Sequence, residues 1–127
     1  MNILNYKAIL YGFASYVFVW VVWALYSIVV SSSSDVHLFI MSVITNLAGL
    51  VPGYVAARIA KIRQLIHGLT IGAIVGLGII LFWSSIGALE NLTWPSYLQL
   101  PITTMVMSLL GSIVAKFYYE RTPNNAL

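Results

Sequence analysis

The chain has 127 residues, of which 61% are hydrophobic and 7% are charged, and its formal net charge is +3. A soluble domain carries charges on about a quarter of its residues, so this composition excludes an ordinary water-soluble fold. The chain contains no cysteine, which excludes disulfides, thiolate metal sites and cysteine nucleophiles. We therefore expect residues 1–127 to form a single integral membrane domain.

Four apolar runs account for most of the chain, and each has the length of about 20 residues that a helix needs to span a bilayer. The expected spans are residues 8–30, 36–57, 65–87 and 97–117. They predict an all-α fold, a four-helix transmembrane bundle. The basic residues lie near both ends of the chain and between the second and third runs. The charged residues of the other two loops are acidic, namely Asp35 and Glu90. The positive-inside rule then predicts that both termini are cytoplasmic.

The first run carries four aromatic residues at steps of three, four and three, which places their rings on one helix face. These residues are Phe13, Tyr16, Trp20 and Trp23. Tyr16 and Trp20 lie deeper than the interfacial aromatic belt normally reaches. The rings either pack against neighbouring helices or lipid, or they form one wall of a pocket for an apolar or cationic ligand.

Small and hydrogen-bonding residues recur along the second run with a period of about 3.5 residues, which predicts a face that contacts protein. They are Ser42, Asn46, Gly49, Gly53, Ala56 and Ala60. Asn46 lies near the middle of the run, where an unpaired amide is costly, so we expect it to bond across helices or to a backbone carbonyl. A contact with a substrate is the alternative role for Asn46. Pro52 cannot donate to the carbonyl of Ala48 and predicts a kink.

A short basic turn joins the second run to the third, and it contains Arg58, Lys61 and Arg63. We expect these side chains to contact lipid headgroups or to set the topology. Glycines spaced by four residues flank the turn and leave one face of each helix without side chains: Gly49 and Gly53 before it, and Gly68, Gly72 and Gly76 after it. We expect the second and third helices to pack closely through these two rows, with a specific homodimer face as the alternative.

This hairpin resembles part of a known group of proteins. Pro52-Gly53-Tyr54-Val55-Ala56-Ala57-Arg58, the basic turn, His67-Gly68 and the glycines at 72 and 76 resemble the second and third spans of short, four-span bacterial membrane proteins of unassigned function. The resemblance is confined to the hairpin. It implies a four-helix protein of the inner membrane and no catalytic or ligand-binding residue.

Residues that could carry chemistry are sparse. No Asp or Glu lies inside an expected span, so a likeness in size to the four-span multidrug exporters fails at the intramembrane carboxylate that those proteins need. His37 and His67 are each isolated from other metal ligands. We expect a headgroup or carbonyl contact for them, with metal or proton binding as the alternative. The sequence thus predicts no catalytic residue, no metal and no other cofactor.

These features predict a multi-pass protein of the cell inner (plasma) membrane that is not an enzyme. Its expected role is structural, regulatory or accessory, through helix–helix contacts. The expected partners are the lipid bilayer and a second copy or another membrane protein, and not nucleic acid. The alternative is an oligomeric passive channel or a small transporter, whose path would follow Ser42 and Asn46 of the second run and Thr104, Ser108 and Ser112 of the fourth.

Overall fold

The computed structural model describes residues 4–30, 35–85, 87 and 94–121, and the described chain forms four α-helices. Their bounds are α1 (Tyr6–Val29), α2 (Asp35–Ala60), α3 (Gln64–Ser85) and α4 (Trp94–Arg121). All four are long and apolar enough to cross a membrane, which indicates a multi-pass membrane protein. The prediction of an all-α fold is confirmed.

The helices do not end where the apolar runs end. α2 continues past residue 57 to Ala60, and α4 begins at Trp94 rather than at residue 97. Hydropathy reports how much of a helix suits lipid, whereas the helix itself continues as long as its backbone groups are satisfied within it. α1 begins at Tyr6 because the side-chain oxygen of Asn5 accepts from the N–H groups of Lys7 and Ala8, at 3.1 and 3.4 Å.

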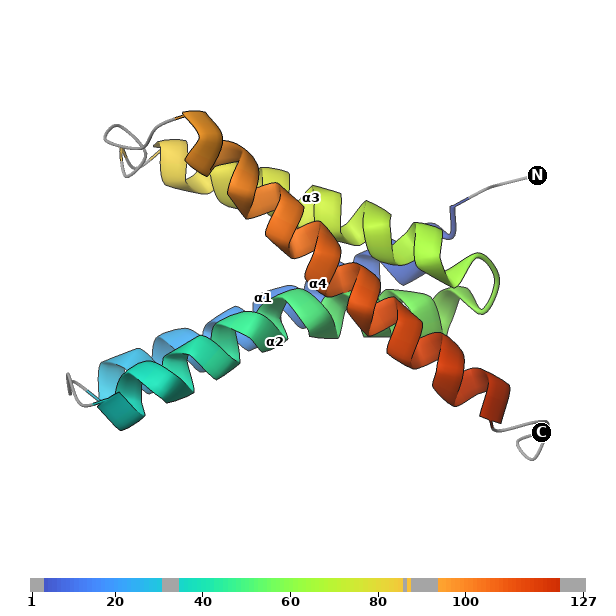
Figure 1. Cartoon of the computed structure of the whole chain (residues 1–127), viewed down its shortest axis with the longest axis horizontal. Coiled ribbons are helices and arrows are strands. Elements are labelled where there is room, and N and C mark those ends of the chain that lie inside the picture. Colours follow the sequence, from blue (N-terminus) through green and yellow to red (C-terminus); the bar gives the residue numbers. More distant parts are fainter. Residues whose placement is uncertain (1–3, 31–34, 86, 88–93, 122–127) are drawn as a thin grey trace.

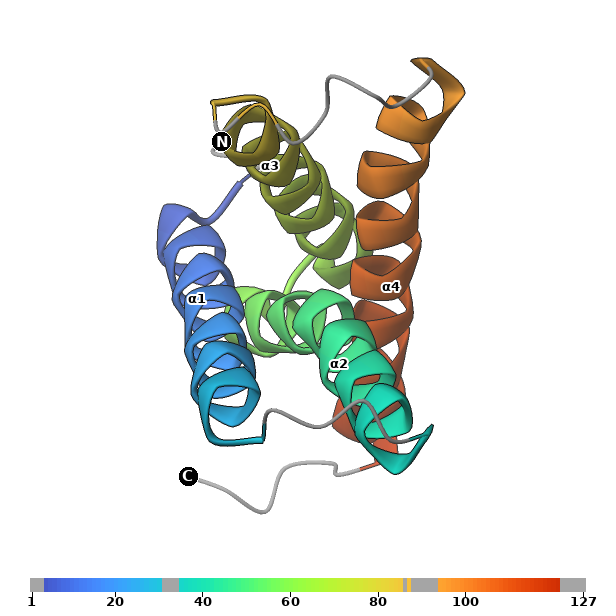
Figure 2. The same cartoon turned by 90° about the vertical axis from the view of Figure 1, so that its left-hand side faces the viewer.

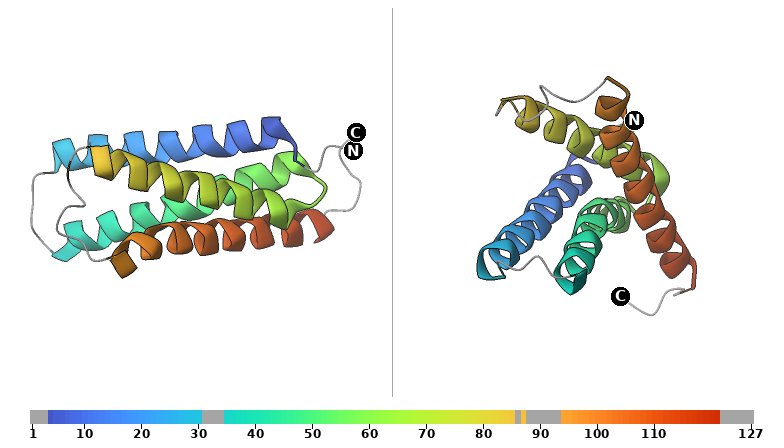
Figure 3. Two further views of the ribbon diagram at one scale, coloured as in Figure 1. Left: turned by 90° about the horizontal axis from the view of Figure 1, so that it is seen from above. Right: turned by 60° about the vertical axis from the view of Figure 1, so that its left-hand side comes forward.

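One end of the molecule collects the basic side chains. The start of α1, the end of α4 and the turn at residues 61–63 lie together there (Figure 3). We name this the basic end after its exposed cations: Lys7, Arg58, Lys61, Arg63 and Lys116. Away from the basic end, the α1–α2 pair diverges from the α3–α4 pair, so the opposite ends of the two pairs are splayed apart (Figure 1).

α4 is the shared partner of α2 and α3, and it lies along both. α1 packs mainly on α2 and touches α3, and among the described residues it makes no close contact with α4 (Figure 2). One buried apolar cluster consists of Ala56, Ile71 and Val75, with Ile9 and Tyr16 of α1 packed against it. This cluster joins α1, α2 and α3, whereas α4 contributes small buried residues, Ser108, Ser112 and Ala115.

α2 changes direction along its course (Figures 1 and 2). Pro52 lies inside this helix and is fully buried. Because proline has no N–H to donate to the carbonyl of Ala48, it is the residue in α2 that permits such a bend, as the sequence predicts.

Candidate functional site

A row of hydroxyl groups on α4 holds the neighbouring helices. Ser108 Oγ donates to the carbonyl oxygen of Gly49 in α2 at 2.9 Å, and Ser112 Oγ lies 3.1 Å from the carbonyl oxygen of Gly53. Thr104 Oγ1 lies 3.0 Å from the carbonyl oxygen of Gly72 in α3. In lipid a hydroxyl has no water to bond, so a backbone carbonyl must satisfy it. Ser108 does this across to α2, whereas Ser112 and Thr104 also lie 2.9 and 3.0 Å from the carbonyl oxygens of Ser108 and Pro101 in α4 itself.

The glycines of α2 make this approach possible. A Cβ added at Gly49 would lie 2.7 Å from the Cβ of Met107, and one added at Gly53 would overlap the carbonyl oxygen of Ser108. Both contacts are with α4. A side chain at either position would therefore push α2 and α4 apart and separate the serine hydroxyls from their acceptors.

The glycine row of α3 also meets α4. An added Cβ at Gly68 would overlap Ser112 Oγ. At Gly72 and Gly76 it would lie 2.7 Å from the Cα of Met105 and 2.5 Å from the Cα of Pro101. α4 thus lies between two glycine rows that come from different helices.

The prediction that the glycine rows of α2 and α3 pack against each other is therefore wrong, because each row packs against α4 instead. Residue spacing shows which positions share a helix face, and it does not show which helix meets that face. Because α4 covers both rows, they are not free to form the homodimer face that was the alternative.

The predicted small-residue seam of α2 divides into two parts. Gly49, Gly53 and Ala56 are buried, whereas Ser42 and Asn46 are exposed on the half of the helix that lies away from the basic end. Asn46 Nδ2 donates to the carbonyl oxygen of Ser42 at 2.8 Å, within its own helix. We expect Asn46 to bond either across helices or to a backbone carbonyl, and the structure has the bond to a backbone carbonyl. The side-chain carbonyl oxygen of Asn46 has no partner among the described residues.

His67 is 2% exposed and ties two helices together at the basic end. Its Nε2 lies 2.8 Å from the backbone N–H of Asn5, and its Nδ1 lies 3.0 Å from the carbonyl oxygen of Arg63. Because an N–H group can only donate, Nε2 must accept, which leaves the proton on Nδ1 to donate to Arg63. This is the carbonyl contact expected for a histidine here, and it is buried rather than placed among headgroups.

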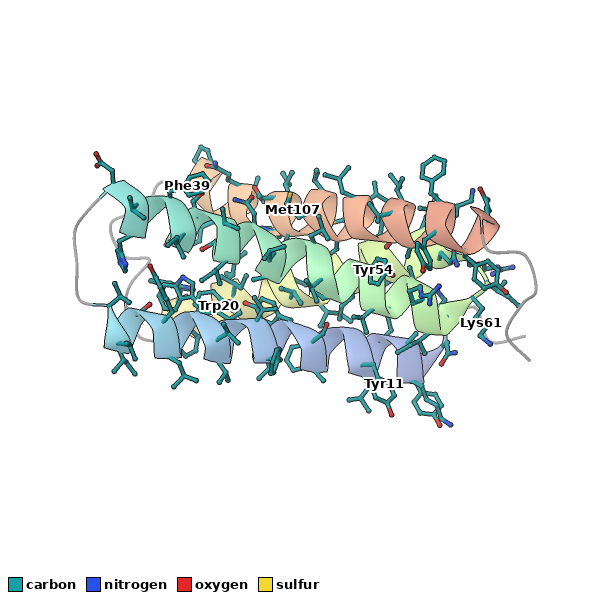
Figure 4. All side chains as sticks on the ribbon, turned by 90° about the horizontal axis from the view of Figure 1, so that it is seen from below. Tyr11, Trp20, Phe39, Tyr54, Lys61 and Met107 are labelled. Carbon is teal, nitrogen blue, oxygen red and sulfur yellow. The ribbon has the colours of Figure 1, made fainter. Side chains whose placement is uncertain are left out.

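The basic turn positions its cations outward. Lys61 and Arg63 have positive φ angles of 57° and 53°, which reverse the chain between α2 and α3, and both side chains are exposed. The guanidinium carbon of Arg58 lies 5.2 Å from the centre of the Tyr118 ring on α4, a cation–π contact that links the ends of α2 and α4. Lys61 is seen at this end of the molecule in Figure 4.

The aromatic row of α1 forms a continuous chain of ring contacts. Ring centres are 6.3 Å apart for Phe13 and Tyr16, 6.2 Å for Tyr16 and Trp20, and 4.9 Å for Trp20 and Trp23. Phe13 is 42% exposed, while the other three rings are half-buried. Phe13 also lines an open hollow between α1 and α3, whereas Tyr16 packs against the buried cluster of Ala56, Ile71 and Val75.

Two glycines that sequence reasoning did not single out for packing also lie at close crossings. A Cβ added at Gly12 of α1 would lie 3.0 Å from the carbonyl oxygen of Pro52, and one added at Gly111 of α4 would overlap that of Leu50. Gly111 belongs to the α4 face that carries Ser108 and Ser112, so the small residues of this face could have indicated a close helix crossing. Gly12 lies one helical turn from Ala8 and from Ser15, so small residues marked this face of α1 as well.

The described residues contain no group of three or more His, Cys, Asp or Glu side chains that could hold a metal ion. Glu90 lies outside the residues that the structure describes. A scan against protein-family models finds no matching family, and searches of curated proteins and of solved structures find no significant match. The resemblance of the hairpin to short bacterial four-span proteins therefore stays a prediction.

Proposed function

We propose that this chain is a multi-pass protein of the cell inner membrane that has a structural, regulatory or accessory role and no catalytic activity of its own. It acts through helix–helix contacts with a second copy or with another membrane protein. In this proposal all four helices span the membrane as one bundle, with both termini in the cytoplasm.

The exposed amide of Asn46 is the observation that carries this proposal. Thr104, Ser108 and Ser112 of α4 have backbone acceptors within the chain, whereas the Asn46 amide is exposed near the middle of α2 and has used one of its donors locally. A polar group at that depth is costly when it faces hydrocarbon. A helix from another protein can satisfy it, and interhelical hydrogen bonds of this kind contribute about 0.6 kcal/mol each and at most about 1.7.

The charge distribution supports the proposed orientation. The exposed cations gather at the end where α1 begins and α4 ends, while Asp35 begins α2 at the opposite end. With four spans, this arrangement agrees with the positive-inside rule when the basic end is cytoplasmic.

The alternative function, a passive channel or small transporter, has weaker support. The hydroxyl face of α4 would have to line its path, but Ser108 and Ser112 are fully buried and are directed at carbonyl groups of α2. Only the exposed Ser42–Asn46 face is left for a polar path.

Photo-crosslinking tests the proposed contact. A photoreactive amino acid is placed at Ser42, one helical turn from Asn46, and the membranes are illuminated. We expect a discrete adduct, whose mass identifies a second copy or a partner protein, and we expect it to weaken in the Asn46→Leu background because the polar contact is lost.

The matched control places the same amino acid at Val114, which is 51% exposed on α4. The proposal assigns no helix contact to this position. It should react with lipid only. If position 42 gives no more protein adduct than position 114, or if Asn46→Leu leaves the adduct unchanged, the α2 face is not a helix-contact site.

A further inference from the structure

An apolar hollow lies between α1 and α3 in the half of the molecule nearest the basic end. It has a volume of about 580 Å³ and is a largely open depression rather than an enclosed pocket. Its lining includes Leu4, Ile9, Leu10, Phe13, Thr70 and Ile74. The hydroxyl of Thr70 already donates to the carbonyl oxygen of Ile66 at 2.8 Å. Tyr6, which is 73% exposed, also belongs to the lining, so the hollow offers mainly apolar contact. Such a lining suits a hydrocarbon chain.

Two cations border the hollow at the basic end. Lys7 is exposed and lies one turn before Leu10 on α1, so it flanks the lining face. Arg63 is exposed and immediately precedes α3. The bonds from Asn5 to His67 and from His67 to Arg63 hold the start of α1 against the start of α3, so Lys7 and Arg63 lie at the same end of the α1–α3 pair as the hollow.

No described carboxylate neutralises these two cations. At the basic end the acidic side chain among the described residues is Glu120, whose Oε1 lies 3.8 Å from Nζ of Lys116 on α4. Asp35 begins α2 at the opposite end of the molecule. The mouth of the hollow therefore keeps its positive charge, which complements the phosphate of an anionic lipid.

We propose that the α1–α3 hollow is a binding site for one anionic phospholipid of the surrounding leaflet. One acyl chain lies against Leu10, Phe13 and Ile74, and the phosphate lies between Lys7 and Arg63. This site is on a different face from the α2 surface around Asn46, so it is independent of the proposed helix contact. It is also more specific than a general attraction of basic residues to the membrane, because it requires the hollow as well as the charge.

Native mass spectrometry of the purified full-length chain in detergent tests the site. The chain is titrated with phosphatidylglycerol or with phosphatidylethanolamine of the same acyl chains. We expect tighter binding of phosphatidylglycerol, and a Lys7→Gln/Arg63→Gln double variant should bind it more weakly by roughly fivefold per charge, or about 25-fold in total. Because the measurement is made in micelles, a change of topology in this variant cannot produce the result.

Two further variants separate a built site from diffuse charge. Ile74→Trp fills the hollow, and since Ile74 is 40% exposed the change leaves the buried core in place. It should abolish tight binding of phosphatidylglycerol, whereas Lys116→Gln, which removes a cation at the same end on α4, should leave binding unchanged. The proposal is overturned if Lys116→Gln weakens binding as much as the loss of one of the two cations at the mouth, or if Ile74→Trp binds as the parent does.

Discussion

Gly53→Ala should destabilise the chain by forcing α2 away from α4. The added Cβ would overlap the carbonyl oxygen of Ser108, and backbone cannot move aside as a flexible side chain can. Separation weakens the Ser108–Gly49 hydrogen bond, worth about 0.6 kcal/mol, whereas Ser112 keeps the carbonyl oxygen of Ser108 as an acceptor at 2.9 Å. Overpacking of a close contact costs about 1–3 kcal/mol more. The intrinsic preference of helices for alanine over glycine opposes this loss by up to about 1 kcal/mol.

Gly78→Ala is the matched control because a Cβ at Gly78 meets nothing within 4 Å. It gains the same helix preference without the clash, so the difference between the two variants isolates the close contact. We expect the free energy of unfolding of Gly53→Ala to be about 2–4 kcal/mol below that of Gly78→Ala. Titration with SDS from a mild detergent, followed by circular dichroism, measures this difference. Equal stability of the two variants would refute the close packing of α2 on α4.

Three further predictions use the same chain. Ser108→Ala should lower the free energy of unfolding by about 0.6 kcal/mol, and by no more than about 1.7, because it removes one interhelical hydrogen bond; a larger loss would mean that the serine does more than donate to Gly49. His67→Phe should cost about 1–3 kcal/mol in the same assay, because the part-buried backbone N–H of Asn5 loses its acceptor; a neutral effect would contradict the tether between α1 and α3. Topology reporters fused after Ser34 and after Asn91 should report the outside of the cell, and a cytoplasmic signal from either would contradict the proposed orientation.

The helices were predictable because their signal is local. Four long apolar runs predict four helices, and the part of the chain that the structure describes has four that are long and apolar enough to cross a membrane. Glycine spacing also marks the helix faces where another helix approaches closely. The ends were less predictable: α2 continues to Ala60 beyond its apolar run, and the cap by Asn5 starts α1 two residues before the predicted span.

The pairing of helices was not predictable from spacing. A glycine row fits any helix that offers a small or hydroxyl-bearing face, and α4 offers one in Ser108 and Ser112 with Gly111 beside them. Both faces of this contact were recognisable in the sequence, but residue spacing within each helix does not show that the two faces meet. The hydrogen bond from Asn5 to His67 could not be predicted for a different reason. Its donor is a backbone N–H, which every residue except proline has, so the residue type does not indicate it.

The central claim is that α4, rather than α3, covers the glycine row of α2, and disulfide trapping tests it most directly because the chain has no native cysteine. A Cβ at Gly49 lies 2.7 Å from that of Met107, so a disulfide between these positions needs a separation of only about 1 Å more. We expect Gly49→Cys/Met107→Cys to form an intramolecular disulfide in membranes under mild oxidation. Gly49→Cys/Gly76→Cys, which would pair if α2 and α3 packed directly through their glycines, should stay reduced. Efficient crosslinking of positions 49 and 76 without crosslinking of 49 and 107 would contradict the account.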